Sequence, residues 1–179
     1  MEDLVRVNLG SGKDYRLHWI NVDGYYEPAD MKFNLAVFPY PFMDNTITEI
    51  FASHILEHLP STVDALEEWW RICKPGAKIT IRVPHYSHIA AYENPTHVRF
   101  FTLDSMKYFT DDTWEHYGKA RFRIIKKELV TVPRLTDSRK VCLHAGMVNR
   151  IIGIHPMLER FMVLFGGISE IVWELEVVK

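Results

Sequence analysis

Two stretches near the start of the chain have residues that could bind a small molecule. The turn Gly10-Ser11-Gly12 follows the alternating apolar residues Val5, Val7 and Leu9, and Asp23 ends a second apolar run shortly after it. A Gly-x-Gly turn after a strand lets backbone approach a ligand closely, because no Cβ is in the way. A carboxylate at the tip of the next strand is typical of sites for ribose hydroxyls. The pair predicts a site for a nucleotide-like ligand; a tight turn beside an exposed acid is the alternative.

The spacing argues against a dinucleotide-binding fingerprint. The third glycine of that motif would fall at Tyr15. Only the six residues 13–18 separate the turn from the next apolar run, at positions 19–22. The usual helix of about ten residues does not fit into that space. We therefore expect two strands joined by a short link.

A first histidine cluster could bind a metal ion. His54, Glu57 and His58 offer three ligands within about a turn and a half of helix. The spacing H-x-x-E-H is that of inverted zinc peptidases, in which two histidines bind zinc and the glutamate is the base. That site needs a long helix, and Pro60 follows two residues after His58. A metal-dependent enzyme that uses these residues is therefore one alternative. The simpler interpretation is that the histidines are hydrogen-bonded without a metal, and we expect no metal.

A second group of histidines follows the next predicted strand and could do acid–base chemistry. His85, His88 and His97 lie downstream of the run at 78–83. Imidazole titrates near neutral pH without special help. We therefore expect the general base to be His85 or His97, followed by His54. Arg99 could bind an anionic acceptor, or it could be an ordinary surface cation.

Composition limits the class of protein. The 179 residues are 47% hydrophobic and have a formal charge of −2, which fits one domain, 1–179, with a sizeable core. This charge gives no strong nucleic-acid signal. Two cysteines make no disulfide framework, the first residues do not open a signal peptide, and the longest uncharged stretch near the end, 161–169, is too short for a transmembrane segment. We expect a cytoplasmic protein.

Hydrophobic periodicity predicts an alternation of strands with few helices. Ser61 caps a predicted helix with Leu66, Trp69 and Trp70 on one face, ended by 74–76. A second helix is expected at 102–109, and 134–169 is expected to be a helical insertion that serves as core, dimer face or lid. The predicted strands are 5–9, 19–22, 31–35, 48–53, 78–83, 122–132 and 170–178.

Polar residues occupy alternate positions in most of the early strands. Strands covered by helices on both faces are nearly continuous apolar runs, which these are not. We therefore expect a two-layer structure whose second sheet face is wet, covered by 134–169 or paired with another subunit as a homodimer. Solvent exposure of Arg6, Asn21 and Lys32 tests this expectation. The alternating polar residues are Arg6, Asn8, Asn21, Lys32, Asn34, Thr80 and Arg82.

Eight segments in order resemble the class I S-adenosylmethionine-dependent methyltransferases, above all the small predicted methyltransferases of the methyltransferase-11 type. The segments are NLGSGK, INVDG, FNL, PYPFMDN, ASHILEHL, EEWWRICKPG, KITIRVP and ELEVVK. The resemblance implies an α/β, Rossmann-like sheet of seven mostly parallel strands, with the last strand antiparallel beside the fifth. The early helices would be shortened or missing, with a helical insertion before the last strand.

The resemblance also implies a cofactor, S-adenosyl-L-methionine, and places its contacts. The turn would hold the methionine part, Asp23 and Gly24 the ribose, Asn34 and Leu35 the adenine, and Ser53 with His54 would lie under the sulfonium. The cofactor residues of the turn are Asn8, Leu9, Gly10, Ser11, Gly12 and Lys13.

The acceptor implied is a small molecule, a glycan or a lipid. The family has a long helix after the glycine turn and an acid where Asn34 stands. Because this chain has neither, a cofactor-binding or assembly module without turnover is the alternative function. A related possibility is a divalent metal ion, because some RNA 2′-O-methyltransferases have two acids and a histidine at a spacing like that of residues 54–58, with a further histidine downstream. Here His54 stands in the place of an acid.

Overall fold

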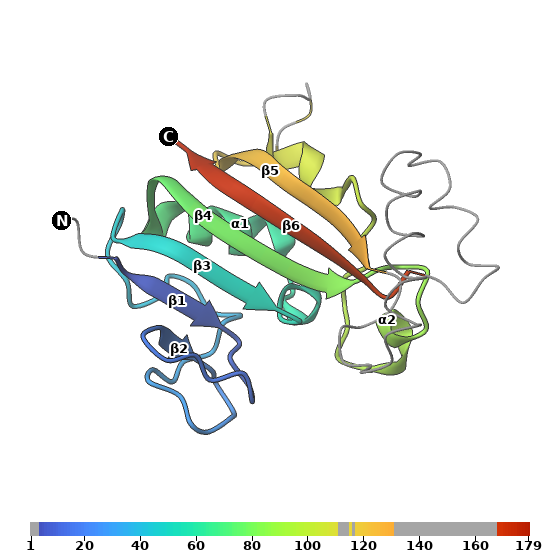
Figure 1. Ribbon diagram of the computed structural model, residues 1–179, viewed down its shortest axis with the longest axis horizontal. Helices are drawn as coiled ribbons and strands as arrows, with labels where there is room; N and C mark the ends of the chain where they lie inside the picture. Colours follow the sequence, from blue (N-terminus) through green and yellow to red (C-terminus); the bar gives the residue numbers. More distant parts are fainter. Residues whose placement is uncertain (1–3, 111–114, 116, 131–167) are drawn as a thin grey trace, which may run out of the picture.

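The computed structural model describes residues 4–110, 115, 117–130 and 168–179. In these residues six strands form one sheet in the order β2-β1-β3-β4-β6-β5 (Figure 1). β1 to β4 are parallel, and β6 is antiparallel to both of its neighbours, β4 and β5. The predicted α/β sheet is confirmed. Its last strand is antiparallel and lies beside the predicted fifth strand, 78–83, which is part of β4 in the structure. The strands are β1 (Arg6–Leu9), β2 (Ile20–Val22), β3 (Ile47–Ser53), β4 (Cys73–Pro84), β5 (Arg121–Val130) and β6 (Glu170–Val178).

The main helix, α1 (Thr62–Ile72), begins where the capping signal predicts. The Ser61 side chain accepts a hydrogen bond from the Asp64 N–H, which satisfies one of the free donors of the first turn. α1 ends at Ile72 and the chain enters β4 at once, so the predicted stop at 74–76 is late. The predicted helix at 102–109 is only a short 3₁₀ helix, η2 (Ser105–Phe109), and sequence analysis missed α2 (Ala90–Glu93). A second 3₁₀ helix, η1 (Leu56–His58), lies before α1.

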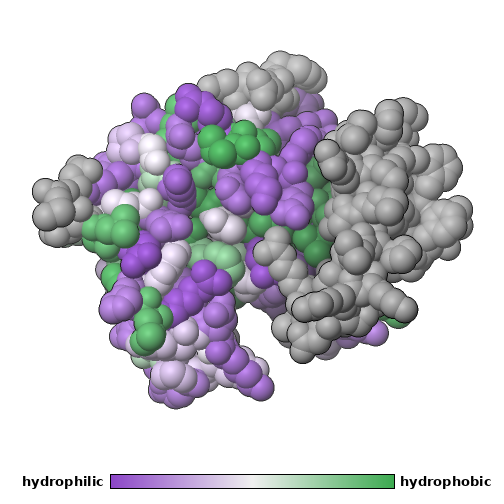
Figure 2. Space-filling model, viewed as in Figure 1, coloured by the Kyte–Doolittle hydropathy of each residue, from purple (hydrophilic) through white to green (hydrophobic). Residues whose placement is uncertain are grey.

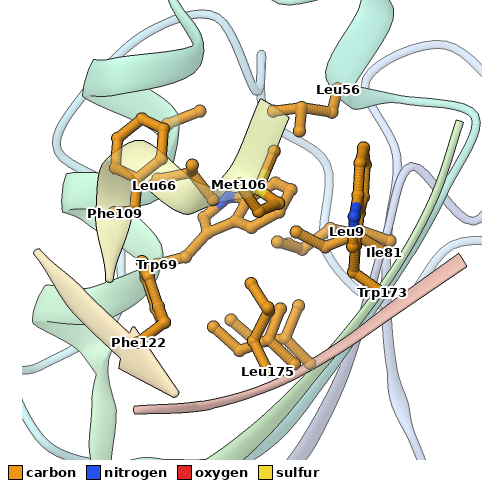
Figure 3. Close-up of a cluster of buried hydrophobic side chains, with 14 of the residues drawn as sticks. Leu9, Leu56, Leu66, Trp69, Ile81, Met106, Phe109, Phe122, Trp173 and Leu175 are labelled. Carbon is orange, nitrogen blue, oxygen red and sulfur yellow. The ribbon is translucent and has the colours of Figure 1, made fainter. Parts of the chain in front are cut away.

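The hydrophobic core lies between α1, η2 and one face of the sheet (Figure 3). Trp69 of α1 and Trp173 of β6 are both fully buried there. Trp173 packs edge to face against Phe101, and its Nε1–H donates to the Leu103 carbonyl at 3.0 Å. A buried indole needs such an acceptor. Trp173 thereby fixes the 101–103 segment on the sheet.

The predicted strand at 31–35 is not a strand. Met31 forms a single isolated bridge with Val22, and the chain then turns away from the sheet edge. The alternating burial that suggested a strand is real, because Phe33 and Leu35 point inward while their neighbours are exposed. Phe33 packs on the Tyr40 ring, 5.1 Å between centroids, instead of joining a ladder. The alternating burial of residues 31–35 therefore indicates an extended segment at the edge of the sheet, and not a paired strand.

No helix of the described residues covers the second face of the sheet, which faces the viewer in Figure 1. Figure 2 shows that this face is largely hydrophilic. Lys32 is exposed and Arg6 is partly exposed, as expected, but Asn21 is fully buried. The expectation is therefore wrong for Asn21. Its cover is the 13–19 link and not a helix layer, because the link folds back on the amide.

The predicted insertion at 134–169 lies almost wholly outside the described residues, so its role and the single-domain assignment stay predictions. No helix in the described part of the chain is long and apolar enough to cross a membrane.

Candidate functional site

The glycine turn ties the tip of β1 to the tip of β2. The backbone N–H groups of Gly10 and Ser11 both donate to the Val22 carbonyl, at 2.9 and 3.0 Å. Gly10 and Gly12 have φ of 66° and 49°, which glycine adopts without steric cost. The turn was predicted to present backbone to a ligand, but its first two amides are used within the protein. The Ser11 hydroxyl is buried and has no hydrogen-bond partner among the described residues.

Gly10 is the position of the turn at which a side chain cannot fit. A Cβ there would lie 2.8 Å from the Ile55 Cβ, far inside van der Waals contact, whereas a Cβ at Gly12 would meet nothing within 4 Å. Gly10→Ala should therefore lower the free energy of unfolding by about 1–3 kcal/mol, from strain at positive φ plus the overlap. Urea denaturation measures it. Gly12→Ala, which has the strain without the overlap, is the control and should cost less; equal losses would contradict the packing argument.

The Asp23 carboxylate points at the glycine turn, as the sequence predicted. Its Oδ2 accepts from the Gly12 N–H at 2.9 Å, and its Oδ1 accepts from the N–H groups of Tyr25 and Tyr26. Burial alone would raise the pKa of Asp23, but these backbone donors outweigh it and lower the pKa. A carboxylate has about four acceptor sites, so part of Oδ2 is left for a hydroxyl donor.

A network of amides and acids takes the place of a helix between β1 and β2. The Asn8 Nδ2 donates to the Asp14 carbonyl at 2.7 Å and to Asn21 Oδ1 at 3.1 Å. The Asn21 Nδ2 in turn donates to the Arg16 carbonyl and to Asp30 Oδ2. Asn8 was predicted to contact the cofactor, but the donor groups of its side chain hold the link instead. The short link is thus ordered by hydrogen bonds.

The remaining predicted cofactor residues lie along the same edge. Gly24 is close to the Phe33 carbonyl, where a Cβ would come within 3.2 Å. Asn34 is exposed and its Oδ1 accepts from the Ala36 N–H. Leu35 is buried and its carbonyl accepts from the Tyr40 hydroxyl, so most of its side chain belongs to the core. Leu9 is fully buried and Lys13 is exposed.

His54 follows Ser53 at the end of β3 and lies between two carboxylates. Its Nε2 is 3.2 Å from Glu170 Oε1, and its Nδ1 is 3.3 Å from Glu57 Oε1. The hydrogen bond to Glu170 and the neighbouring Glu57 carboxylate raise the pKa of His54 to about 9. A protonated imidazole cannot accept a proton, which makes His54 the weakest of the three predicted bases. Sequence analysis missed Glu170, although the predicted pairing of the last strand with the fifth could have located it.

Glu170 should make stability depend on acid pH. Burial alone would raise its pKa, but hydrogen bonds from His54 and Arg82 lower it from 4.5 to about 2. The folded pKa is below the unfolded one, so this stabilisation is complete above pH 4.5 and is lost as pH falls toward 2. Glu170→Gln should remove on the order of 1–3 kcal/mol at neutral pH and flatten this acid limb.

Urea denaturation of the Glu170→Gln variant across the acid range measures the effect. Glu176→Gln is the matched control on the same strand, because Glu176 pairs with the exposed Arg123 and such surface pairs contribute little. Parallel acid limbs for wild type and Glu170→Gln would contradict the assignment.

His85 and His97, the other predicted bases, lie in different surroundings. His85 is fully buried, and its Nδ1 accepts from the Ser87 N–H at 3.1 Å and lies 2.7 Å from Ser87 Oγ. His97 Nδ1 donates to the Ala91 carbonyl at 3.0 Å. In neutral His97 the Nε2 is then unprotonated and can accept a proton, so the geometry favours His97 over His85 as a base.

A third cluster joins the two histidine groups that the sequence presented separately. Potential ligand atoms of Glu57, His58 and His97 all lie within 4.8 Å of one another. The predicted set of His54, Glu57 and His58 is thus not the one brought together. His97 takes the place of His54 in the observed cluster. It lies next to Glu57 because the N–H groups of Val98 and Arg99 donate to the Glu57 carbonyl. Sequence spacing could not show this contact, because α1, β4 and α2 lie between the two segments.

Comparison with known proteins agrees with this architecture. A family model described as a methyltransferase domain, of the methyltransferase-11 type, matches residues 26–81. A chain of the complex between the Haloferax volcanii Trm112 methyltransferase activator and the putative methyltransferase is similar at TM-score 0.60 and 16% identity, covering 97% of this chain and 82% of that one. The protein has the class I methyltransferase fold. The predicted resemblance is confirmed.

Two further structures share the class I methyltransferase fold. A SAM-dependent methyltransferase from Archaeoglobus fulgidus has TM-score 0.58 and 16% identity, over 98% of this chain and 87% of that one. Phosphoethanolamine N-methyltransferase 2 of Haemonchus contortus, in complex with S-adenosyl-L-methionine, has TM-score 0.57 and 14% identity, over 99% and 49%. No curated protein matches the chain significantly in sequence. Relative to the seven strands that the resemblance implies, the third is here only the Met31 bridge.

Proposed function

We propose that this protein is an S-adenosylmethionine-dependent methyltransferase acting on a small-molecule, glycan or lipid acceptor. The observation that carries the proposal is the position of Asp23 at the tip of β2, facing the glycine turn within a class I methyltransferase fold. An acid at this place is suited to ribose hydroxyls. The matching methyltransferase family model over residues 26–81 supports the same class.

The residues at this edge fit an adenosyl ligand. Asp23 is held in its ionised form by backbone donors and retains acceptor capacity on Oδ2. Lys13 beside the turn offers a cation for a carboxylate. When bound, the cofactor supplies an activated methyl group, so the protein has mainly to position an acceptor and, for a hydroxyl, to take up its proton. In the metal-free protein, His97, with its bare Nε2, is the residue we assign to that proton.

Calorimetry with S-adenosylhomocysteine tests the first step. We expect binding to one site per chain by the wild-type protein. Absence of binding at millimolar ligand would contradict the proposal. If it binds, transfer of a labelled methyl group to glycans, lipids and small metabolites tests turnover, and His97→Ala should lower the rate by roughly a hundredfold or more with cofactor affinity retained.

The second candidate function is a cofactor-binding or assembly module without turnover. The observation in its favour is that the Gly10, Ser11 and Gly12 amides are all engaged within the protein, with no helix N-terminus behind them. Fewer backbone donors are then left for a ligand. Binding of S-adenosylhomocysteine without methyl transfer to any acceptor would favour this second function. The neighbour in complex with a methyltransferase activator makes addition of an activator a useful arm of the screen.

A further inference from the structure

Glu57 is a buried carboxylate whose hydrogen-bonding capacity is not used. It is 1% exposed, and neither of its oxygens has a hydrogen-bond partner in the described part of the protein. A buried charge without donors is costly, and such a group in a folded protein is commonly explained by an ion or water. His54 Nδ1 lies 3.3 Å from Oε1 and supplies charge, but not a hydrogen bond, to this carboxylate. Something else is needed to satisfy Glu57.

Two neighbouring histidines lie beside Glu57, and each has one ring nitrogen that is unprotonated in the neutral ring. His97 Nδ1 bonds the Ala91 carbonyl, which can only accept, so in the neutral ring the hydrogen is on Nδ1 and Nε2 is bare. His97 Nε2 lies 4.0 Å from Glu57 Oε1. The rings of His97 and His58 lie edge to face, with centroids 4.6 Å apart.

The tautomer of His58 follows from the hydrogen bonds of Thr96. The Thr96 hydroxyl donates to Asn94 Oδ1 at 2.8 Å, so it can only accept from His58 Nδ1, which is also 2.8 Å away. His58 Nε2 is then bare as well.

The geometry points to a divalent transition-metal site formed by Glu57 Oε, His58 Nε2 and His97 Nε2. One possible ligand atom of each group lies within 4.8 Å of those of the other two, and neither Glu57 oxygen accepts a hydrogen bond in the described part of the protein. Two imidazoles and one carboxylate suit Zn²⁺ and its first-row neighbours; Mg²⁺ and Ca²⁺ prefer all-oxygen sets. The ligand atoms, now within 4.8 Å, need only approach to the spacing of about 3.3 Å that tetrahedral zinc imposes.

The surroundings of the cluster are those of a metal site. Each histidine has its other ring nitrogen fixed by an oxygen acceptor, the Ala91 carbonyl or the Thr96 hydroxyl, which orients metal ligands in proteins. The backbone of Glu57 is fixed by the N–H groups of Val98 and Arg99. Two histidines and a glutamate leave at least one coordination position for water or another oxygen. The site lies next to His54, at the end of β3 where the proposed reaction would take place.

Metal binding by the full, untagged chain tests this site. Metal is first removed by a chelator, and the protein is then equilibrated with micromolar Zn²⁺ or Co²⁺. We expect one ion per chain by elemental analysis. We also expect the visible absorption spectrum of the Co²⁺ protein to be that of an ion with a low coordination number. Glu57→Gln, of nearly the same shape, should weaken Zn²⁺ binding at least about 100-fold. A wild-type protein without stoichiometric Zn²⁺, or a folded Glu57→Gln variant of unchanged affinity, would overturn the assignment.

Two further variants make the result specific. Thr96→Val removes the acceptor of His58 at an exposed position, and should weaken Zn²⁺ about 10–100-fold and alter the Co²⁺ spectrum. It decides the matter if Glu57→Gln does not fold. His88→Ala, before α2 and outside the cluster, should retain the affinity; a loss with this variant would contradict the ligand set. Because the readout is metal content, failure here leaves S-adenosylhomocysteine binding untouched.

Discussion

Asp23→Ala is expected to reduce affinity for S-adenosylhomocysteine by roughly a hundredfold or more, because it removes the acceptor that we assign to the ribose hydroxyls. It should also lower the free energy of unfolding by about 2–4 kcal/mol, since the N–H groups of Gly12, Tyr25 and Tyr26 lose their shared acceptor. The two losses have separate measurements, calorimetry for binding and urea denaturation for stability.

The matched control for Asp23 is Asp14→Ala. Asp14 lies in the same region, but its carboxylate is exposed and pairs only with Arg16 in the described structure. Its removal should change stability by less than about 0.5 kcal/mol and leave ligand affinity in place. If Asp23→Ala retains full affinity while destabilised, the carboxylate is a structural cap of the turn and the adenosyl assignment fails.

Trp173→Ala is expected to cost about 3–5 kcal/mol of folding free energy, the range for large buried aromatic residues. The side chain is fully buried, packs on Phe101 and donates to the Leu103 carbonyl. The variant loses transfer free energy, leaves a cavity and removes one hydrogen-bond donor from the Leu103 carbonyl. Thermal and urea unfolding measure the loss.

A second effect of Trp173→Ala should appear at a distance. Phe101 and Leu103 follow directly on the loop that contains His97, so we expect metal affinity to fall as well if that loop is loosened. Tyr25→Ala is the control, since Tyr25 is 88% exposed and its removal should change stability by less than about 0.5 kcal/mol. A Trp173→Ala protein of wild-type stability would contradict the described core.

Sequence patterns predicted what local periodicity and a capping residue can specify. β6 matches its predicted range, and α1 begins after Ser61, because alternation and capping are short-range effects. The segment at 31–35 misled the same reasoning, since Phe33 and Leu35 alternate for packing under the sheet edge and not for pairing. The hydrophobic periodicity of a segment indicates which of its side chains are buried. It does not indicate whether its backbone is hydrogen-bonded to a neighbouring strand.

The candidate site divides in the same way. The carboxylate of Asp23 facing the glycine turn was predictable, because both lie at the tips of adjacent strands. The engagement of Asn8 with Asn21 was not, since it depends on how the 13–19 link folds back. The approach of His97 to Glu57 was equally hidden, because it depends on backbone hydrogen bonds between segments forty residues apart. Spacing finds groups on one element, and tertiary contacts choose among them.

The link between β1 and β2 has a consequence for the dynamics of this edge. Its order comes from directional bonds among Asn8, Asn21 and Asp30, while its own Leu17 is 76% exposed and buries little apolar surface. Segments held in this way open locally at a lower free energy than packed core strands. In native-state hydrogen exchange, the amide of Arg16 should therefore exchange much faster than the amides of β4. The rim of the ligand site would then open locally while the sheet beneath it stays folded.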